Sequence, residues 1–488
     1  MIYTDILVIG AGITGTALAR ELSRYDASLC VVDRSCDVAG GATKANSGIV
    51  HAGYDAKPGS LKAKYNVRGA AMYPSLCAAL GVPYLNCGAL VIALSPGDVD
   101  TLHALEARGI QNGVAGLRVT DRAEMLRLEP GLNPEAVAAL EVPSSAIVSP
   151  YEMAFALADD AAVNGARFFF DAPVDSVART EDGRWQVRAG SETFVCGAVI
   201  NCAGASGAAL HDMFSGEKLN MVHRRGQYYL LDRSLSLPFS RTVFQCPTKM
   251  GKGVLISPTV HGNLLIGPNA EDIDDPLSTE TTAAGLSEVL EKARLTWPGI
   301  SVRSNITNFS GIRAHLDTDD FMVGAVSGCP GVFEAIGIES PGLSSAPAIA
   351  EDLAPRVAGY LSLKLKDQLV PYPVPEKPFH QMTAAEREDA VARNPLYGQI
   401  ICRCEVVTEA EIRAAVRRPV GARTIDGIKR RTRAGMGRCQ GGFCSPRVAA
   451  ILAEELGCSL SDVTKDGGES RLLCGTIADF LKAGDSDD

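Results

Sequence analysis

Residues 5–33 read DILVIGAGITGTALARELSRYDASLCVVD, and their pattern predicts the architecture of the first part of the chain. Ile6–Ile9 is a short apolar run rich in branched residues, which predicts a buried strand. A glycine turn follows it, and apolar residues at helical spacing then predict a helix. A second apolar run, Leu29–Val32, ends at Asp33. Strand, glycine turn, helix, strand and acid form the first unit of a dinucleotide-binding fold.

Each part of this unit has a physical task. Gly10 permits the tight turn, Gly12 lets a pyrophosphate approach the backbone, and Gly15 lets helix and strand pack closely. The N-terminus of the helix offers free N–H groups and the positive end of a dipole to phosphates. Asp33 is placed to accept hydrogen bonds from a ribose and to repel a 2′-phosphate, which argues against an NADP site. The turn alone does not choose between NAD and FAD.

The middle of the chain alternates between two kinds of segment. Residues 198–207, AVINCAGASG, predict another buried strand that returns to the nucleotide-binding part. Runs such as GALVIAL, GQYYLL and NLLIGP predict a largely antiparallel sheet in a substrate domain. We expect one module over residues 1–370, with these approximate parts: nucleotide-binding residues 1–84, 150–220 and 308–370, and substrate-domain residues 85–149 and 221–307.

Composition limits the class of protein. The chain has 488 residues and a net charge of −10, which argues against a nucleic-acid binder. The opening MIYTDILVIGAG has neither a basic segment nor a cleavage site, so we expect no signal peptide. No apolar run approaches the ~18 residues that cross a bilayer. Fourteen cysteines without an export signal indicate a reducing compartment. The local basic cluster at residues 429–433 is interpreted as a solvated face rather than a docking patch.

A second informative stretch is GGATKANSGIVHAGYDAKPGSLKAKYN, residues 40–66. It resembles the flavin-binding segment of the D-amino-acid-oxidase-like flavoenzymes, and it is most similar to the branch with glycerol-3-phosphate oxidases and dehydrogenases and L-2-hydroxyglutarate dehydrogenases. The resemblance continues in GKGVLISPTVHGNLLIGP (251–268), SGIRA (310–314) and AIGIESPGLSSAPAIAEDL (335–353). It implies a mixed α/β (α+β) fold. A Rossmann-like FAD-binding domain would carry an inserted substrate domain, whose sheet is mixed or antiparallel.

The resemblance also implies which residues contact the flavin. It assigns them to Gly10, Gly12, Thr14, Gly15, Asp33, Arg34, Thr43, Ser47, Gly48, Val174, Ala203, Gly204, Gly311, Gly337, Gly342 and Leu343. In such proteins the small residues around His51 lie against the flavin ring. His51 would then face the substrate, where a neutral imidazole suits removal of a hydroxyl proton. Packing or tethering of the flavin is the alternative role for this histidine.

The same resemblance suggests how a small anionic substrate is held. Arg313 in SGIRA resembles a substrate-anchoring arginine, whose planar fork matches a carboxylate or phosphate. Lys252 resembles a second anion contact, with Lys249 as the alternative, and Ser340 is a further candidate for substrate contact. An ordinary salt bridge for Arg313 and a solvated loop for Lys252 are the structural alternatives. Because Arg313 suits either anion, it does not separate a phosphate from a dicarboxylate.

Four cysteines in the tail form a compact pattern. Residues 371–378, PYPVPEKP, begin a proline-rich linker that we place at 371–395, before a small domain at 396–480. Cys402 and Cys404, with Cys439 and Cys444, offer four thiolates for a [2Fe-2S] cluster or for zinc. They resemble the ligands of bacterioferritin-associated ferredoxin, whose small helical domain also ends anaerobic glycerol-3-phosphate dehydrogenases. Cys458 and Cys474 are interpreted as packing residues.

These features lead to one expected function and two alternatives. We expect an FAD-dependent dehydrogenase that oxidises glycerol 3-phosphate to dihydroxyacetone phosphate and passes electrons through the cluster to a partner subunit. The alternatives are an L-2-hydroxyglutarate, other 2-hydroxyacid or amino-acid dehydrogenase on the same scaffold, and an electron-transfer subunit without a substrate. We expect a cytoplasmic protein that reaches a membrane, if at all, through its partner.

Overall fold

The computed structural model of the chain describes residues 1–233, 239–247, 253–475 and 477. The contacts among its residues divide it into two compact units. Unit 1 comprises Met1–Arg34 and Val38–Val374, and unit 2 comprises Ser35–Asp37 and the chain from Pro375 onward. Each unit has hydrophobic clusters of its own.

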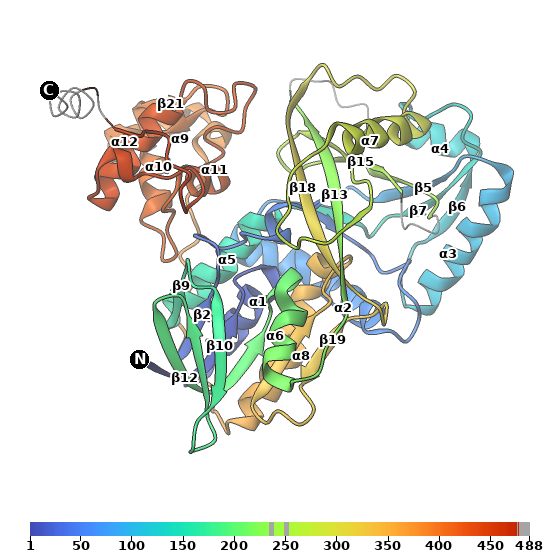
Figure 1. Ribbon diagram of the computed structural model, residues 1–488. Coiled ribbons are helices and arrows are strands. Elements are labelled where there is room, and N and C mark those ends of the chain that lie inside the picture. Colours follow the sequence, from blue (N-terminus) through green and yellow to red (C-terminus); the bar gives the residue numbers. More distant parts are fainter. Residues whose placement is uncertain (234–238, 248–252, 476, 478–488) are drawn as a thin grey trace, which may run out of the picture. The chain divides into compact units, whose positions relative to one another are not determined.

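A parallel sheet in the order β9, β2, β1, β12, β20 lies in unit 1 (Figure 1). Its strands are β1 (Ile2–Ile9), β2 (Leu29–Val32), β9 (Ala166–Phe169), β12 (Glu192–Asn201) and β20 (Val332–Ile336). In the pairing register, Ile9 is level with Val32 and with Asn201. The central strands therefore end at one edge, where ligands bind in sheets of this kind.

Three shorter strands extend this sheet. They are β10 (Val174–Arg179), β11 (Trp185–Ala189) and β19 (Met322–Ala325). β11 pairs antiparallel with the first half of β12, whereas β20 pairs parallel with its second half. β10 and β19 pair antiparallel with β11 and β20, respectively. The predicted Rossmann-like arrangement is therefore confirmed, with an antiparallel extension.

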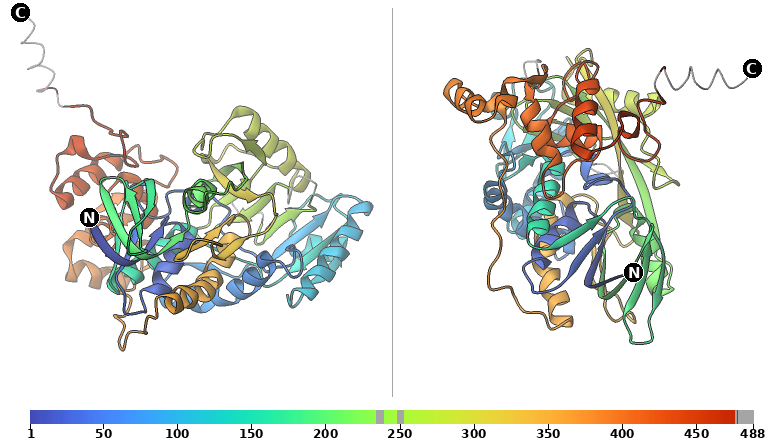
Figure 2. Two further views of the ribbon diagram at one scale, coloured as in Figure 1. Left: turned by 60° about the horizontal axis from the view of Figure 1, so that its bottom comes forward. Right: turned by 90° about the vertical axis from the view of Figure 1, so that its left-hand side faces the viewer.

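Helices pack against this sheet and against one another. They are α1 (Ile13–Leu22), α2 (Leu61–Leu80), α5 (Pro150–Val163), α6 (Gly207–Ser215) and α8 (Gly342–Tyr360). α1 contacts α5 and α8, and α8 also contacts α2. Figure 2 shows α8, in orange, beside α2, in blue. The two helices cross closely at Gly69, where an added Cβ would lie 2.0 Å from the carbonyl oxygen of Ser344.

The second sheet of unit 1 is almost entirely antiparallel. Its strands run in the order β17, β13, β16, β15, β14, β5, β7, β6, and β18 also pairs with β13. Their bounds are β5 (Ala89–Ala93), β6 (Arg118–Asp121), β7 (Ala138–Val142), β13 (Met221–Leu231), β14 (Thr242–Gln245), β15 (Leu255–Pro258), β16 (Leu264–Gly267), β17 (Glu271–Ile273) and β18 (Asn305–Leu316). Only β14 and β5 are parallel neighbours. The predicted inserted sheet is confirmed.

The long pairing of β13 with β18 shifts one expected boundary. Met221 pairs with Leu316, and Leu231 pairs with Asn305. Residues 308–316 therefore join the antiparallel sheet, although we expected the nucleotide-binding part to resume at about 308. The cause is the twelve-residue extended run NITNFSGIRAHL, which matches the length of β13.

Short elements complete unit 1. A small sheet joins β3 (Ile49–Val50), β8 (Ala146–Val148) and β4 (Tyr84–Leu85). The helices associated with the antiparallel sheet are α3 (Val99–Gln111), α4 (Arg122–Leu128) and α7 (Ala283–Thr296).

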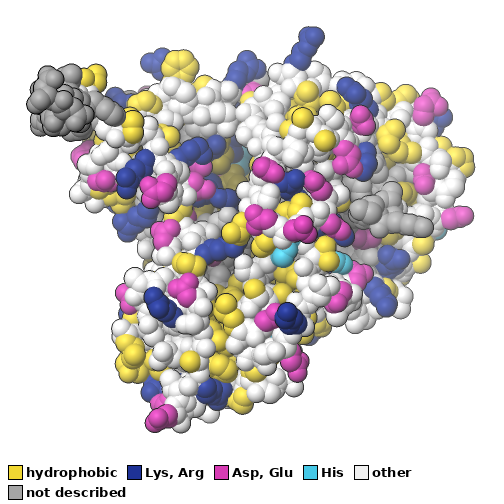
Figure 3. Space-filling view, viewed as in Figure 1, with side chains coloured by type: hydrophobic (Ala, Val, Ile, Leu, Met, Phe, Trp, Pro, Cys, Tyr) yellow, Lys and Arg dark blue, Asp and Glu magenta, His cyan; other side chains and the backbone are white. Residues whose placement is uncertain are grey.

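Figure 3 shows acidic side chains gathered over the segment after β17, where Asp274, Asp275 and Glu280 are exposed. Part of the negative charge of the chain therefore lies on unit 1.

Unit 2 is small and mostly helical. Its elements are α9 (Ala384–Arg393), β21 (Ile400–Cys402), β22 (Val407–Thr408), α10 (Glu409–Val416), α11 (Ile425–Thr432) and α12 (Ser445–Leu456). Capping boxes start α9 at Thr383 and α10 at Thr408, because each has a glutamate three residues later that returns the hydrogen bond. Residues 371–378 have no regular secondary structure, whereas α9 occupies most of the remainder of the expected linker.

The basic cluster at residues 429–433 is not a solvated face. Arg430 and Arg433 are only 7% and 8% exposed. Arg430 pairs with Asp466 at 3.0 Å, and Arg433 pairs with Glu405 at 2.8 Å. The interpretation from sequence was wrong because the acidic partners lie about 30 residues away in the chain, outside any local pattern.

None of the helices that the structure describes combines the length and the apolar character that a bilayer span requires.

Candidate active site and metal centre

The glycine turn after β1 is required by close backbone contacts. Gly10 has a φ of +108°, and an added Cβ would lie 2.3 Å from the carbonyl oxygen of Cys202. A Cβ at Gly15 would lie 1.8 Å from the carbonyl oxygen of Gly10. Both glycines therefore let α1 pack directly against the ends of β1 and β12. At Gly12 an added Cβ would meet only the hydroxyl of Thr43, at 3.2 Å.

Residues from three segments meet at the start of α1. The N–H of Ala11 donates to Asp33 Oδ2 at 2.6 Å, and the N–H of Ile13 donates to Thr43 Oγ1 at 2.9 Å. The helix begins at the cap residue Gly12 without a side-chain cap of its own. This arrangement fits an anion at the first turn, because early N–H groups of a helix have no partner within it.

The remaining residues assigned to the nucleotide lie around the same edge. Arg34 is exposed and donates to the Ser206 hydroxyl at 3.0 Å. Ala203 and Gly204 follow β12, and an added Cβ at Gly204 would meet no protein atom within 4 Å. Thr14 is buried in the first turn of α1, and Val174 starts β10. Open space beside these small residues fits the close approach of a dinucleotide.

The segment KANSGIVHAGYD lies directly against the antiparallel sheet. An added Cβ at Gly311 in β18 would lie 1.9 Å from the carbonyl oxygen of Ala45. The Ser47 hydroxyl is 3.3 Å from the Tyr228 hydroxyl of β13. Gly48 has a φ of +67°. The small residues therefore serve a contact within the protein, between this segment and β18, as well as any contact with a flavin.

His51 follows β3 and is half-buried. Its backbone N–H donates to Ser344 Oγ in α8 at 2.8 Å, which ties this segment to the helix. The imidazole ring lies 5.7 Å from the ring of Phe244, tilted by 35°. His51 lines a cavity of about 500 Å³, as do Ser340 and the fully buried Asn66. The structure thus brings His51 and Ser340 to one cavity.

Both polar atoms of the Asn66 amide are buried, and neither has a hydrogen-bond partner among the residues that the structure describes. Such an amide is costly, because burial removes its hydrogen bonds to water without replacement. Nothing in the sequence pattern indicates this residue, since an asparagine inside a helical pattern is usually solvated.

Arg313 is on β18, opposite Arg224 of β13, and it does not line that cavity. Its Nη2 donates to the carbonyl oxygen of Asn269 at 3.3 Å. An added Cβ at Gly226 would lie 2.9 Å from that nitrogen, so Gly226 leaves room for the guanidinium. Among the described residues Arg313 forms no ion pair. Lys249 and Lys252 lie outside the described residues.

The turn before α8 carries three of the assigned residues. Gly337 has a φ of +68°, and an added Cβ would lie 2.5 Å from the side chain of Leu316. α8 begins at Gly342 without a side-chain cap, and the Tyr73 hydroxyl donates to the carbonyl of Leu343. The first turn of α8 therefore has N–H groups available for an acceptor, as the resemblance implies for a flavin.

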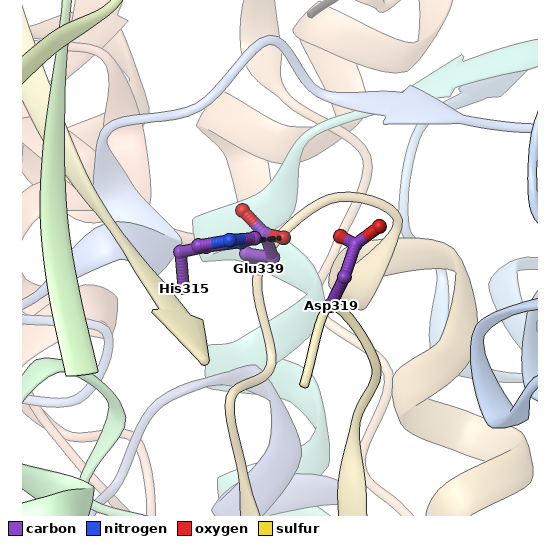
Figure 4. Close-up of side chains that lie close together, drawn as sticks. All are labelled: His315, Asp319 and Glu339. Atoms are coloured by element: carbon purple, nitrogen blue, oxygen red, sulfur yellow. Dashed lines mark hydrogen bonds and ion pairs between the residues drawn. The ribbon is translucent and has the colours of Figure 1, made fainter. Parts of the chain in front are cut away.

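A charged cluster next to this turn was not anticipated from the sequence. The Lys62 ammonium lies 2.8 Å from Glu339 and 3.2 Å from Asp319. His315 Nδ1 lies 2.8 Å from the same Glu339 oxygen (Figure 4). Burial lowers the pKa of Lys62, but the ion pair with Glu339 outweighs it and leaves the pKa raised. The Lys62 ammonium already balances the charge of the two carboxylates, as a metal ion would. We therefore do not assign a metal to the three residues His315, Asp319 and Glu339.

The four predicted cysteines of unit 2 come from two segments, residues 402–404 and 439–444, and they form two pairs. Cys404 and Cys439 have sulfurs 3.7 Å apart, and Cys402 and Cys444 share a hydrogen bond. Cys402 and Cys444 are buried, whereas Cys404 is exposed and Cys439 half-buried. The Cys444 thiol and two backbone N–H groups lower the pKa of Cys402 to about 6, although burial opposes them. The donors favour thiolate, the form that binds metal.

The sulfur positions favour two metal ions over one. Four thiolates on a single tetrahedral zinc would all lie about 3.8 Å from one another, given a Zn–S distance of ~2.3 Å. No three cysteine sulfurs of the described chain lie within 4.8 Å of one another. Two separate pairs fit a binuclear [2Fe-2S] cluster, in which each iron takes two thiolates.

Two further cysteines differ from expectation. Cys458 and Cys474 are exposed, so they are not packing residues. The other four cysteines were predicted as ligands from their close spacing in the sequence, and Cys458 and Cys474 have no such spacing.

The chain matches two family models. Residues 5–356 match the family described as FAD dependent oxidoreductase, and residues 400–454 match the BFD-like [2Fe-2S] binding domain. The first match spans most of unit 1, and the second contains all four of the predicted ligand cysteines.

Three known proteins illustrate the similarity. A glycerol 3-phosphate dehydrogenase of Caloramator mitchellensis is 42% identical over 96% of this chain and 98% of its own length. An L-2-hydroxyglutarate dehydrogenase of Arabidopsis thaliana is 29% identical and covers 72% of this chain and 82% of its own. The structure of dithionite-reduced L-α-glycerophosphate oxidase from Mycoplasma pneumoniae with FAD bound has 30% identity and a TM-score of 0.73, over 78% of this chain and 100% of that one.

Both the arrangement of unit 1 and the paired cysteines of unit 2 agree with these matches. The chain therefore belongs to the FAD dependent oxidoreductase family and carries a BFD-like [2Fe-2S] binding domain after its flavin module.

Proposed function

We propose that this chain is a dehydrogenase that oxidises glycerol 3-phosphate to dihydroxyacetone phosphate. One observation carries the proposal: the similarity to the Caloramator mitchellensis dehydrogenase runs through both the flavin module and the cluster domain. We propose that unit 1 is the flavin module and unit 2 the cluster domain. Bound FAD would accept the hydride from C2 of the substrate, and the cluster would carry electrons onward singly.

His51 is our proposed catalytic base. It would remove the proton of the C2 hydroxyl as the hydride leaves, since alcohol oxidation loses both. Its place in the cavity wall, together with Ser340, supports a role next to a small substrate. The hydrogen bond from its backbone N–H to Ser344 would hold the segment at the start of α8.

Arg313 is our proposed anchor for the substrate phosphate. A guanidinium that forms no ion pair among the described residues has donors available for an anion, which supports this role. Lys252, or alternatively Lys249, remains our proposed second cation. The first turn of α8, with Gly337 and Gly342, remains our proposed contact for the flavin, where the helix dipole would favour negative charge.

Electrons would leave through the cluster to a partner protein, because a [2Fe-2S] centre transfers them but does not bind substrate. Any membrane association would depend on that partner. A second candidate activity is oxidation of L-2-hydroxyglutarate, which the Arabidopsis thaliana relative favours and Arg313 would also suit.

Anaerobic flavin reduction tests the choice of substrate. We expect glycerol 3-phosphate to bleach the flavin absorbance of the holoenzyme and L-2-hydroxyglutarate to leave it unchanged. The reverse result would replace the proposal by the second candidate, and bleaching by neither would overturn both.

A substitution tests the base. His51→Asn should slow single-turnover flavin reduction by ~10²-fold or more, the usual contribution of general base catalysis. His103→Asn is the matched control, because that side chain is 59% exposed on α3. Reduction of His51→Asn at the wild-type rate would refute the assignment.

A further inference from the structure

The surface around the cluster cysteines combines one exposed aromatic ring with exposed arginines. Phe443 is 87% exposed, more than any other large hydrophobic side chain in the described chain. It sits immediately before Cys444, in the loop that begins at Cys439. The loop conformation explains its direction: the N–H groups of Phe443 and Gly441 bond to the Cys439 sulfur, which leaves the ring on the outside.

Three arginines flank the same ligands and are exposed. Arg403 lies between Cys402 and Cys404, and Arg438 precedes Cys439. Arg447 follows Cys444 by three positions and lies 3.6 Å from Glu409, with its side chain still 62% exposed. This positive charge is local, because unit 2 as a whole has 17 Lys and Arg against 18 Asp and Glu.

Of the two cysteine pairs, the pair Cys404 and Cys439 is nearer the surface, because Cys402 and Cys444 are buried. An electron that leaves the cluster therefore has its shortest way out next to Arg403, Arg438 and Phe443. A single exposed apolar side chain is common on protein surfaces, so the position of Phe443 beside the predicted ligands and the exposed arginines, rather than its exposure alone, points to binding. Aromatic side chains and arginines are the residue types that dominate the energy of protein interfaces.

We propose that Phe443, Arg403, Arg438 and Arg447 form the docking surface for a separate electron-acceptor protein with an acidic surface around its redox centre. The proposal builds on the electron path of the proposed function but is independent of the substrate. A single ring among polar groups is too little apolar surface for a permanent interface and suits a transient encounter. Attraction between opposite charges speeds such encounters and weakens with salt. In each encounter the reduced cluster loses one electron and the acceptor gains it.

Two cytochromes of opposite charge serve as probes. Holoenzyme is reduced with dithionite, freed of excess reductant anaerobically, and mixed with acidic cytochrome b5 or basic cytochrome c. We expect cluster oxidation by cytochrome b5 to fall about tenfold between low and physiological salt, and no such fall with cytochrome c. Titration calorimetry of the two oxidised proteins should give tighter binding to cytochrome b5 at low salt.

Variants locate the surface. Phe443→Ser and Arg447→Glu should each slow oxidation by cytochrome b5 about tenfold and weaken its binding, with the visible spectrum of the cluster unchanged. Arg423→Glu, an exposed arginine remote in sequence from the cysteines, is the charge control and should change the rate less than about twofold. Equal rates in all three variants, or tighter binding of cytochrome c, would overturn the proposal.

One further outcome would assign the surface to another occupant. If Phe443→Ser slows only the transfer of electrons from flavin to cluster, the surface docks on the flavin module of the same chain, and the proposal fails. Because dithionite reduces the protein without substrate, none of these results depends on glycerol 3-phosphate. A wrong substrate assignment would therefore be recognised separately.

Discussion

Replacing Lys62 by methionine should destabilise unit 1 by about 2–3 kcal/mol. The side chains of Lys62 and Glu339 are 13% and 11% exposed and lie 2.8 Å apart. Removing one partner of a buried ion pair costs about 3–5 kcal/mol, because the other charge remains buried. His315 stays next to the same Glu339 oxygen and offsets part of this cost. Asp319 is 82% exposed and adds less than about 1 kcal/mol.

The expected shift can be measured by thermal unfolding of the holoenzyme, followed by the rise of flavin fluorescence. With an unfolding entropy of about 2.1 cal/mol/K per residue, a unit of about 370 residues should lose ~3–4 °C in Tm. Lys64→Met is the matched control on the same helix, since Lys64 is 55% exposed and lies 3.5 Å from its partner. It should shift Tm by less than about 1 °C.

A double substitution decides whether charge is the cause. Glu339→Gln should restore part of the stability lost in Lys62→Met, because it removes the charge that the lysine balances. Equal Tm values for Lys62→Met and Lys64→Met would refute the reasoning. Purely additive losses in the double variant would also refute it.

Three other changes test separate features. Gly311→Ala should lower the free energy of unfolding in urea by more than about 3 kcal/mol and reduce the FAD content, because the added Cβ would lie 1.9 Å from the carbonyl oxygen of Ala45. Wild-type stability and FAD content would contradict that contact. Asn66→Leu should raise the free energy of unfolding by about 1 kcal/mol, since the buried amide has no hydrogen-bond partner in the described part of the chain. A lower free energy of unfolding would contradict this. Iron chelation under reducing conditions should increase the alkylation of Cys404 and Cys439 by iodoacetamide, measured by mass spectrometry. Equal alkylation before and after chelation would argue against their being ligands.

Features set by the local backbone could be predicted from the sequence. Residues 5–33 specify strand, turn and helix in an order that only a few folds use, and Gly10 and Gly15 occupy positions where any Cβ would collide with backbone. The spacing of the four cysteines in the sequence likewise predicts a metal centre. The spacing, CxC with CxxxxC, also favours a cluster over zinc, whose sites usually show CxxC pairs, but it does not predict which sulfurs of the two segments pair.

Ion pairs between distant residues could not be predicted from the sequence, because a sequence does not reveal which charges come into contact. Lys62 and Glu339 are nearly 280 positions apart, and nothing near either residue indicates the other. The same holds for Asn66, whose burial depends on the tertiary packing around the start of α2 rather than on its neighbours in the chain.

The arginines of unit 2 show why this difference matters for function. Arg430 and Arg433 belong to the densest basic run in the sequence, yet they are buried and paired with acids. The scattered Arg403 and Arg438 attract no attention in the sequence, yet they are exposed beside the four predicted ligand cysteines. A partner protein is attracted by charge at the surface, whereas it does not meet charge that is buried. The location of a charge in the fold, rather than its density in the sequence, therefore determines which arginines can guide an electron acceptor to the cluster.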